Sequence, residues 1–196
     1  FNMEKLRNLW KDSYATEEKK IRVVEFLSAY EELKIIVGHL GYAFGFVQQD
    51  MATKIQIIGD VAKTYPDKVF IEDIILEEAK KEDFRKTKST LARNVLRLWR
   101  ALEFVCLFLR NLEAGNVEVC PALSSAYTDT LKKYHPWLLQ QSIYVAVRTA
   151  PYKANFFKAI GVTEEEAKKL DTVDHMESVR DNLKAFWEKH DMMMLP

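Results

Sequence analysis

Helix-breaking residues and cysteines are both scarce in this sequence. Its 196 residues include six glycines, five prolines and two cysteines. So few breakers over this length favour long helices over many short strands and turns. Cys106 and Cys120 are too few for a disulfide framework, and neither has the partner spacing of a metal site. This usage indicates a reducing compartment, and we expect a cytoplasmic protein.

An excess of charge of one sign and a long apolar run are also missing. The 29 basic residues are balanced by 29 acidic ones. This balance argues against a nucleic-acid partner, which needs a dense basic surface. No segment approaches the ~18–20 apolar residues of a membrane span, and the charged start of the chain, with Glu4, Lys5 and Arg7, is not a signal-peptide core. We therefore expect any membrane contact to be transient and made from outside.

Catalytic motifs are a third absence. The sequence has no G-x-S-x-G, phosphate loop, H-E-x-x-H or cysteine ligand cluster. His39, His175 and His190 lie far apart without partner spacing. We therefore expect no enzyme, no metal and no organic cofactor. An acid–base pair acting on a lipid is the alternative in this class, and it would use Asp50 and His135.

Helical periodicity, in contrast, runs through almost the whole chain. Apolar residues make up 48% of it, which is enough for a sizeable core. Without repeats or linkers, the simplest interpretation is one domain over 1–196. Glu17 and Glu18 suit the first turn of a helix, and Thr163 with Glu166 forms a capping box. The spacing of apolar residues predicts an all-α bundle of seven or eight helices, and its clearest segments are 17–38, 46–64, 67–82, 87–113, 121–134, 137–149 and 163–190.

Two charged groups stand out on these predicted helices. Asp50 and Lys54 are four residues apart and share a helix face. Arg93 and Arg97 have the same spacing, so two like charges share a face and repel each other. Two guanidinium groups that converge in this way suit a phosphate. Surface ion pairs, or arginines that are solvated or paired with acids elsewhere, are the simpler interpretations, and spacing alone does not decide.

A histidine and a tryptophan follow at a predicted break between helices. His135 stands in LKKYHPWLLQ, where a lone histidine is more often a structural donor than a catalyst. Trp137 is more often a core residue, although tryptophan beside a tyrosine and lysines also resembles a group at a membrane surface.

Four segments together resemble the glycolipid transfer protein superfamily. They occur in the family's order and span roughly residues 20 to 160. The segments are FGFVQQD (44–50), RNVLRLWRALEFVCLFL (93–109), AYTDTLKKYHPWLLQ (126–140) and APYKANFFKAIG (150–161).

The resemblance implies a fold and three residue roles. The family's fold is a two-layer helical sandwich of about eight helices that encloses an apolar lipid pocket. Asp50 stands where the family's aspartate accepts hydrogen bonds from the lipid's amide and headgroup. His135 stands where a histidine donates to the ceramide amide carbonyl, and Trp137 resembles the membrane-docking tryptophan. A buried amide needs such partners, since leaving one unpaired costs several kcal/mol.

Two departures from the glycolipid carriers narrow the implied ligand. Those carriers have an asparagine where this chain has Lys54, and a sugar-stacking tryptophan where it has Arg97. Trp99 lies two residues further along the helix and so points elsewhere. Lys54, Arg93 and Arg97 match the phosphate-binding cations of the ceramide-1-phosphate carriers, including the plant accelerated-cell-death type. We therefore expect transfer of ceramide-1-phosphate.

Several expectations remain open at this stage. A glycolipid carrier with an atypical site and a lipid sensor or scaffold that does not transfer are alternatives. Arg85, Lys86, Lys88 and Arg100 could add to the phosphate site or attract anionic lipid. We expect a monomer with a sphingolipid ligand. Candidate pocket residues, for which plain core packing is as good an interpretation, are Phe44, Phe46, Val47, Leu96, Phe104, Phe108, Leu138, Ile143 and Val147.

Overall fold

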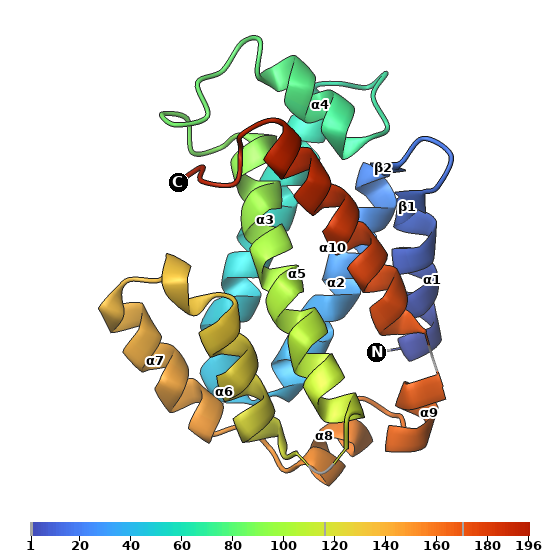
Figure 1. Ribbon diagram of the computed structural model, residues 1–196, viewed down its shortest axis with the longest axis vertical. Coiled ribbons are helices and arrows are strands. Elements are labelled where there is room, and N and C mark those ends of the chain that lie inside the picture. Colours follow the sequence, from blue (N-terminus) through green and yellow to red (C-terminus); the bar gives the residue numbers. More distant parts are fainter. Residues whose placement is uncertain (1, 116, 170) are drawn as a thin grey trace.

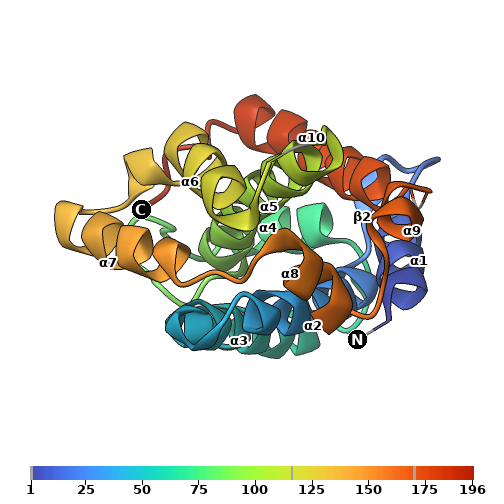
Figure 2. The ribbon, with the colours of Figure 1, turned by 90° about the horizontal axis from the view of Figure 1, so that it is seen from below.

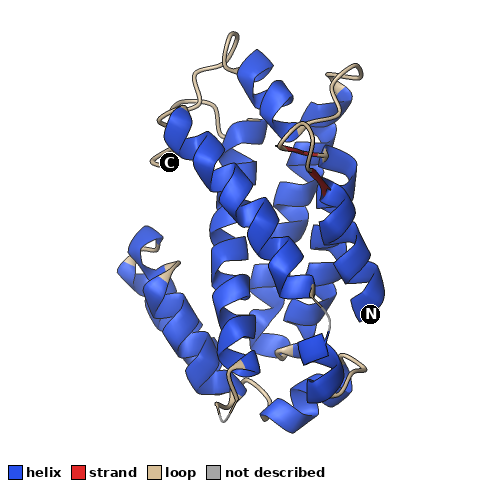
Figure 3. Cartoon of the chain, turned by 45° about the vertical axis from the view of Figure 1, so that its right-hand side comes forward, coloured by secondary structure: helices blue, strands red, loops and turns tan. Residues whose placement is uncertain are grey.

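The computed structural model describes residues 2–115, 117–169 and 171–196, apart from the side chains of residues 168 and 169. This part of the chain is almost entirely helical (Figures 1 and 3). Two short 3₁₀ helices cover Tyr42–Phe44 and Lys132–Tyr134. The α-helices are α1 (Met3–Ser13), α2 (Val23–His39), α3 (Gly45–Lys63), α4 (Ile71–Glu78), α5 (Leu91–Glu113), α6 (Val119–Asp129), α7 (Trp137–Arg148), α8 (Lys153–Ala159), α9 (Glu164–Lys169) and α10 (Thr172–Lys189).

The long helices form two layers, which confirms the predicted fold class. Figure 2 shows α2 and α3 in one layer and α5, α6 and α10 in the other. Both layers bury apolar side chains in one shared core. The Tyr30 hydroxyl of α2 donates to the Leu98 carbonyl of α5 at 2.7 Å and so joins the layers. Within the second layer, Trp99 Nε1 donates to the Arg180 carbonyl of α10 at 2.8 Å.

The helix predictions hold best in the middle of the chain. Gly45–Lys63, Leu91–Glu113 and Trp137–Arg148 agree with predicted helices to within about four residues at each end. The predicted helices 67–82 and 121–134 are shorter in the structure, at Ile71–Glu78 and Val119–Asp129.

The prediction was wrong at the ends of the chain. Glu17 and Glu18 lie in a turn and not in a helix, because the chain makes a small antiparallel hairpin there, β1 (Tyr14–Ala15) with β2 (Lys20–Ile21). The predicted helix 163–190 is two helices, α9 and α10, and residue 170 between them lies outside the described residues. Its capping box is confirmed, since Thr163 and Glu166 exchange hydrogen bonds of 2.7–3.1 Å.

Candidate anion and lipid site

Helix α5 carries Arg93, Arg97 and Arg100 in its N-terminal half, and its first turn is firmly held. Thr90 Oγ1 accepts from the Arg93 N–H at 3.3 Å. The buried Glu78 carboxylate accepts from the N–H groups of Leu91 at 3.0 Å and Ala92 at 3.3 Å. These acceptors satisfy main-chain donors that a helix leaves free at its start. The first turn of α5, which includes Arg93, is therefore held in place by Thr90 and by Glu78 of α4.

Helix α3 packs against α5 and brings Asp50 and Lys54. The two side chains form the ion pair that their spacing predicts. Their environments differ, because the Lys54 side chain is 10% exposed and that of Asp50 is 65% exposed. The lysine therefore points into the protein while the aspartate stays within reach of a ligand.

The arginines of α5 lie close enough to affect one another. Burial lowers the pKa of Arg93, and the positive charge of Arg97 lowers it further. Burial also lowers the pKa of Arg100, where Arg97 again contributes. Among the described residues, the side chain of Arg97 has no hydrogen bond or ion-pair partner, and the residue is only half-buried. An anion would relieve this crowding of positive charge.

Main-chain oxygens from the end of the chain reach two of these arginines. Arg93 Nε donates to the main-chain oxygen of Pro196 at 2.9 Å. Arg100 Nη2 donates to the carbonyls of Met193 at 2.8 Å and Leu195 at 3.2 Å. This contact could not be predicted, because main-chain acceptors leave no pattern of residue types.

His135 follows the 3₁₀ helix Lys132–Tyr134 and faces the same cluster. Its Nδ1 lies 3.2 Å from the Tyr127 hydroxyl. Burial lowers the pKa of His135; the charge of Asp50 opposes this, and the charges of Arg100 and Lys54 reinforce it. The imidazole is thus neutral near pH 7. When the Tyr127 hydroxyl donates to Nδ1, the ring proton sits on Nε2 and can serve a ligand.

Trp137 is not a core residue, because it is 70% exposed at the start of α7. Leu138 beside it is 72% exposed, and Val145 on the same helix is 62% exposed. An apolar surface of this kind suits a membrane better than water.

The nine predicted pocket residues differ in burial: Phe44, Leu96, Phe108 and Val147 are buried, Phe46 and Leu138 are exposed, and Val47, Phe104 and Ile143 are half-buried. Their role in binding lipid stays a prediction.

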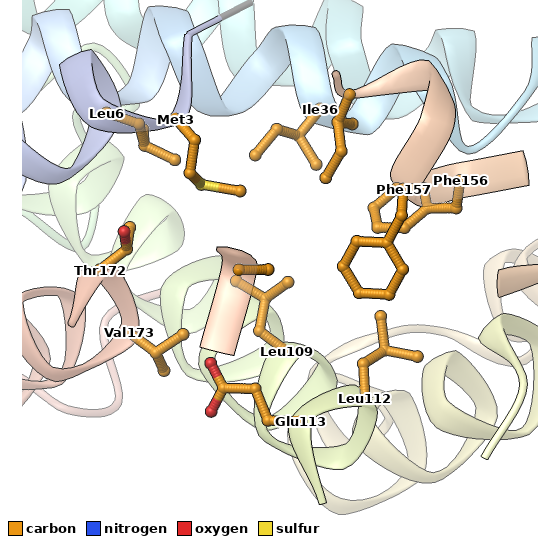
Figure 4. A pocket seen from close by; sticks show the side chains of 12 residues that line it. Met3, Leu6, Ile36, Leu109, Leu112, Glu113, Phe156, Phe157, Thr172 and Val173 are labelled. Atoms are coloured by element: carbon orange, nitrogen blue, oxygen red, sulfur yellow. The ribbon is translucent and has the colours of Figure 1, made fainter. Parts of the chain in front are cut away.

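A small apolar cavity lies at the far end of α5 from the arginines. Its volume is about 30 Å³, roughly that of one water molecule. Helices α1, α2, α5, α8, α9 and α10 line it (Figure 4). This cavity was not predicted, since its wall comes partly from α1 and α8, which we did not predict as helices. The lining residues are Met3, Leu6, Ile36, Leu109, Leu112, Glu113, Phe156, Phe157, Ile160, Ala167, Thr172 and Val173.

The described residues include neither a candidate metal site nor a candidate membrane-spanning helix. Among the described residues, no group of three or more histidine, cysteine or acidic side chains is placed to hold a metal ion. In the same part of the chain, no helix combines the length and apolarity needed to cross a bilayer.

Comparison with known proteins assigns the chain to a family. The pattern of the family described as "Glycolipid transfer protein (GLTP)" matches residues 21–162. The chain is 27% identical to the ceramide-1-phosphate transfer protein of Xenopus tropicalis, over 100% of this chain and 97% of that one. It is 30% identical to a glycolipid transfer protein of Aureobasidium melanogenum, over 78% and 75% of the two chains.

A solved structure agrees with these relatives. The apo crystal structure of mouse ceramide-1-phosphate transfer protein superposes on the whole of this chain, and the whole of that one, with a TM-score of 0.92 at 24% identity. The fold is therefore that of the all-helical lipid carriers. The chain belongs to the glycolipid transfer protein family, as its four sequence segments predicted.

Proposed function

We propose that this protein binds a ceramide-1-phosphate-type sphingolipid and moves it between membranes without making or breaking a bond. The observation that carries this proposal is the cationic cluster on α3 and α5. Lys54, Arg93 and Arg97 concentrate positive charge, and Arg97 has no partner among the described residues. A phosphate monoester carries close to two negative charges and several strong acceptor oxygens. Guanidinium groups match it in charge and geometry.

The remaining residues suit the rest of such a lipid. Asp50 is exposed beside Lys54 and can accept from the amide N–H of a ceramide. His135 can donate Nε2–H to the amide carbonyl. Trp137 and Leu138 would dock on the bilayer from the cytoplasm while the chains move between the helix layers. Each methylene of the lipid gains ~0.8 kcal/mol on burial, so escape through water is slow without a carrier.

The test is transfer of fluorescent ceramide-1-phosphate between vesicles, run beside fluorescent galactosylceramide. We expect fast transfer of the phosphate lipid alone. Arg97→Leu should lower this transfer at least roughly tenfold, because a charge-assisted hydrogen bond is worth about 1.5–3 kcal/mol. Arg97→Lys keeps the positive charge but loses the planar guanidinium that binds a phosphate with two donors. Its transfer rate should lie between those of the parent and Arg97→Leu. Lys11→Leu removes an exposed charge on α1 and should change nothing.

The other outcomes distinguish the alternatives. The 30% identical fungal relative makes a glycolipid carrier the second candidate, and transfer of galactosylceramide would establish it. Binding without transfer would indicate a sensor or scaffold. Release of free phosphate or ceramide would indicate an enzyme. An Arg97→Leu variant as fast as the parent would exclude the cationic cluster as the headgroup site.

A further inference from the structure

The six residues after α10's C-cap, 191–196, are packed onto the body of the protein. Figure 1 shows this segment curling beside the N-terminal end of α5. Met192, Met193 and Leu195 are half-buried and pack on the core, whereas Met194 is 83% exposed. The Met192 N–H donates to the Trp187 carbonyl at 2.9 Å. The side chains of Met192, Met193 and Leu195 thus anchor the segment, and the Met192 hydrogen bond joins it to the end of α10.

Its main chain meets the two most buried arginines of the cluster. Arg93 is 4% exposed and Arg100 is 8% exposed. The oxygens of Met193, Leu195 and Pro196 accept from them at 2.8–3.2 Å. Buried guanidinium donors need acceptors, and for Nη2 of Arg100 the neutral carbonyls of Met193 and Leu195 supply them.

The neutrality of these acceptors matters for an anion site. A carboxylate in the same place would satisfy the donors but cancel the charge that attracts a phosphate. A carbonyl satisfies a donor, fixes the plane of the guanidinium and leaves its positive charge in place. Arg100 is held on a second side, because its guanidinium carbon lies 4.0 Å from the centre of the Tyr134 ring. Tyr134 is the residue before His135, so the same contact ties Arg100 to the 3₁₀ helix that precedes His135.

We propose that the 191–196 segment is a positioning element of the headgroup site, whose main-chain oxygens hold Arg93 and Arg100 so that their charge and free donors select an anionic headgroup. This inference rests on the proposed function and adds a part of the site that no side-chain motif marks. The segment itself does not touch the lipid in this proposal. It acts through the arginines, much as partners behind a metal ligand orient that ligand.

The test detaches the segment without deleting its main chain. The triple variant Met192→Ser, Met193→Ser and Leu195→Ser removes the apolar anchors, and Met194→Ser is the matched control because that side chain is exposed. Transfer of ceramide-1-phosphate and the midpoint of thermal unfolding are measured for each variant. We expect the triple variant to lose roughly tenfold of its phosphate-lipid transfer at a temperature where it stays folded. Met194→Ser should match the parent in transfer.

A ³¹P NMR measurement distinguishes a loss of arginine positioning from a general loss of folding. Cations held close to a phosphate lower its second pKa, so ³¹P NMR of bound ceramide-1-phosphate should show a higher pKa in the triple variant than in the parent. Phosphate-lipid transfer equal to the parent's in a folded triple variant, or an unchanged phosphate pKa, would overturn the proposal. If the triple variant does not fold, Leu195→Ser alone is measured in the same way. If the parent protein transfers no phosphate lipid, the proposed function is wrong, and this inference is wrong with it.

Discussion

Glu72 is a buried carboxyl group whose charge the protein tolerates poorly. It is 4% exposed, and its two oxygens lie 3.0 and 3.2 Å from the Ile21 main-chain nitrogen. Burial raises its pKa to about 7, although the Ile21 N–H opposes the shift. The folded state therefore binds this proton more tightly than the unfolded state does. Its contribution favours folding at low pH and is lost as the pH rises from about 4.5 to about 7.

Glu72→Gln should therefore stabilise the protein at pH 8, since it keeps an acceptor for Ile21 and removes the buried charge. The expected gain is on the order of 2 kcal/mol in the free energy of unfolding. Denaturant unfolding at pH 8 and pH 5 measures it, and at pH 5 the gain should fall to roughly a quarter of its value at pH 8. Glu77→Gln, in the same helix, is the control: the pKa of Glu77 is lowered by its hydrogen bond with Lys80, so it should give no gain. A Glu72→Gln effect that is independent of pH would contradict this account.

His135 is held neutral by burial, which lowers its pKa. Its proposed role as a donor to the lipid amide needs only the neutral ring. His135→Leu should reduce transfer roughly tenfold, since one hydrogen bond to a buried amide is lost. His135→Gln retains a donor and should lose less, and His39→Leu serves as a control on α2. The vesicle assay should give the same rate for the parent protein at pH 7.0 and 7.5. A strong change across that range that is absent in His135→Gln would show that the ring titrates there.

At the scale of the element, the start of α5 depends on a residue from α4. Glu78 is buried and accepts from two main-chain N–H groups of α5. The two helices are separated by a loop, so this carboxylate fixes where α5 begins relative to α4. The arginines follow within the next turns of the same helix.

Glu78→Ala should destabilise the protein by roughly 2 kcal/mol, because it leaves two buried donors without an acceptor. Thermal unfolding should show a fall of several degrees in Tm, since about 1 kcal/mol corresponds to 2–4 °C at this chain length. Lys88→Ala, at an exposed position in the loop between α4 and α5, is the control. Unchanged stability in the Glu78 variant would mean that water replaces the carboxylate.

The elements also explain what the sequence could and could not predict. Helices α3 and α5 have long apolar stripes, so their bounds and the shared faces of Asp50–Lys54 and Arg93–Arg97 followed from spacing. The β1–β2 hairpin has two residues per strand, too few for an alternating pattern. The break between α9 and α10 has no proline or glycine to mark it. The contact of Pro196 with Arg93 joins residues 103 apart through a main-chain atom, which no local pattern encodes.

At the scale of the whole molecule, the exposed apolar side chains of α7 project at one edge of the sandwich. Figure 1 places α7 at the margin, beside α6. In the proposed docking, a membrane would meet this surface beside the proposed headgroup site, because His135 and Trp137 are two residues apart.

Trp137→Ala with Leu138→Ala should weaken binding to vesicles at least roughly tenfold, since burying two large apolar side chains is worth about 3–6 kcal/mol when complete. Sedimentation with liposomes measures the bound fraction. Val24→Ala alters an apolar residue that is 67% exposed on α2 and should leave binding unchanged. Equal partitioning of the double variant and the parent would place the docking surface elsewhere.

The small cavity at the end of α5 has a mechanical consequence. It has room for about one water-sized object, whereas a two-chain lipid brings many methylene groups into the protein. If such a lipid binds between the helix layers, as proposed, the layers must move apart, and the complex is wider than the empty fold. X-ray scattering in solution should then show a larger radius of gyration for the loaded protein than for the empty one, and equal radii would contradict this account.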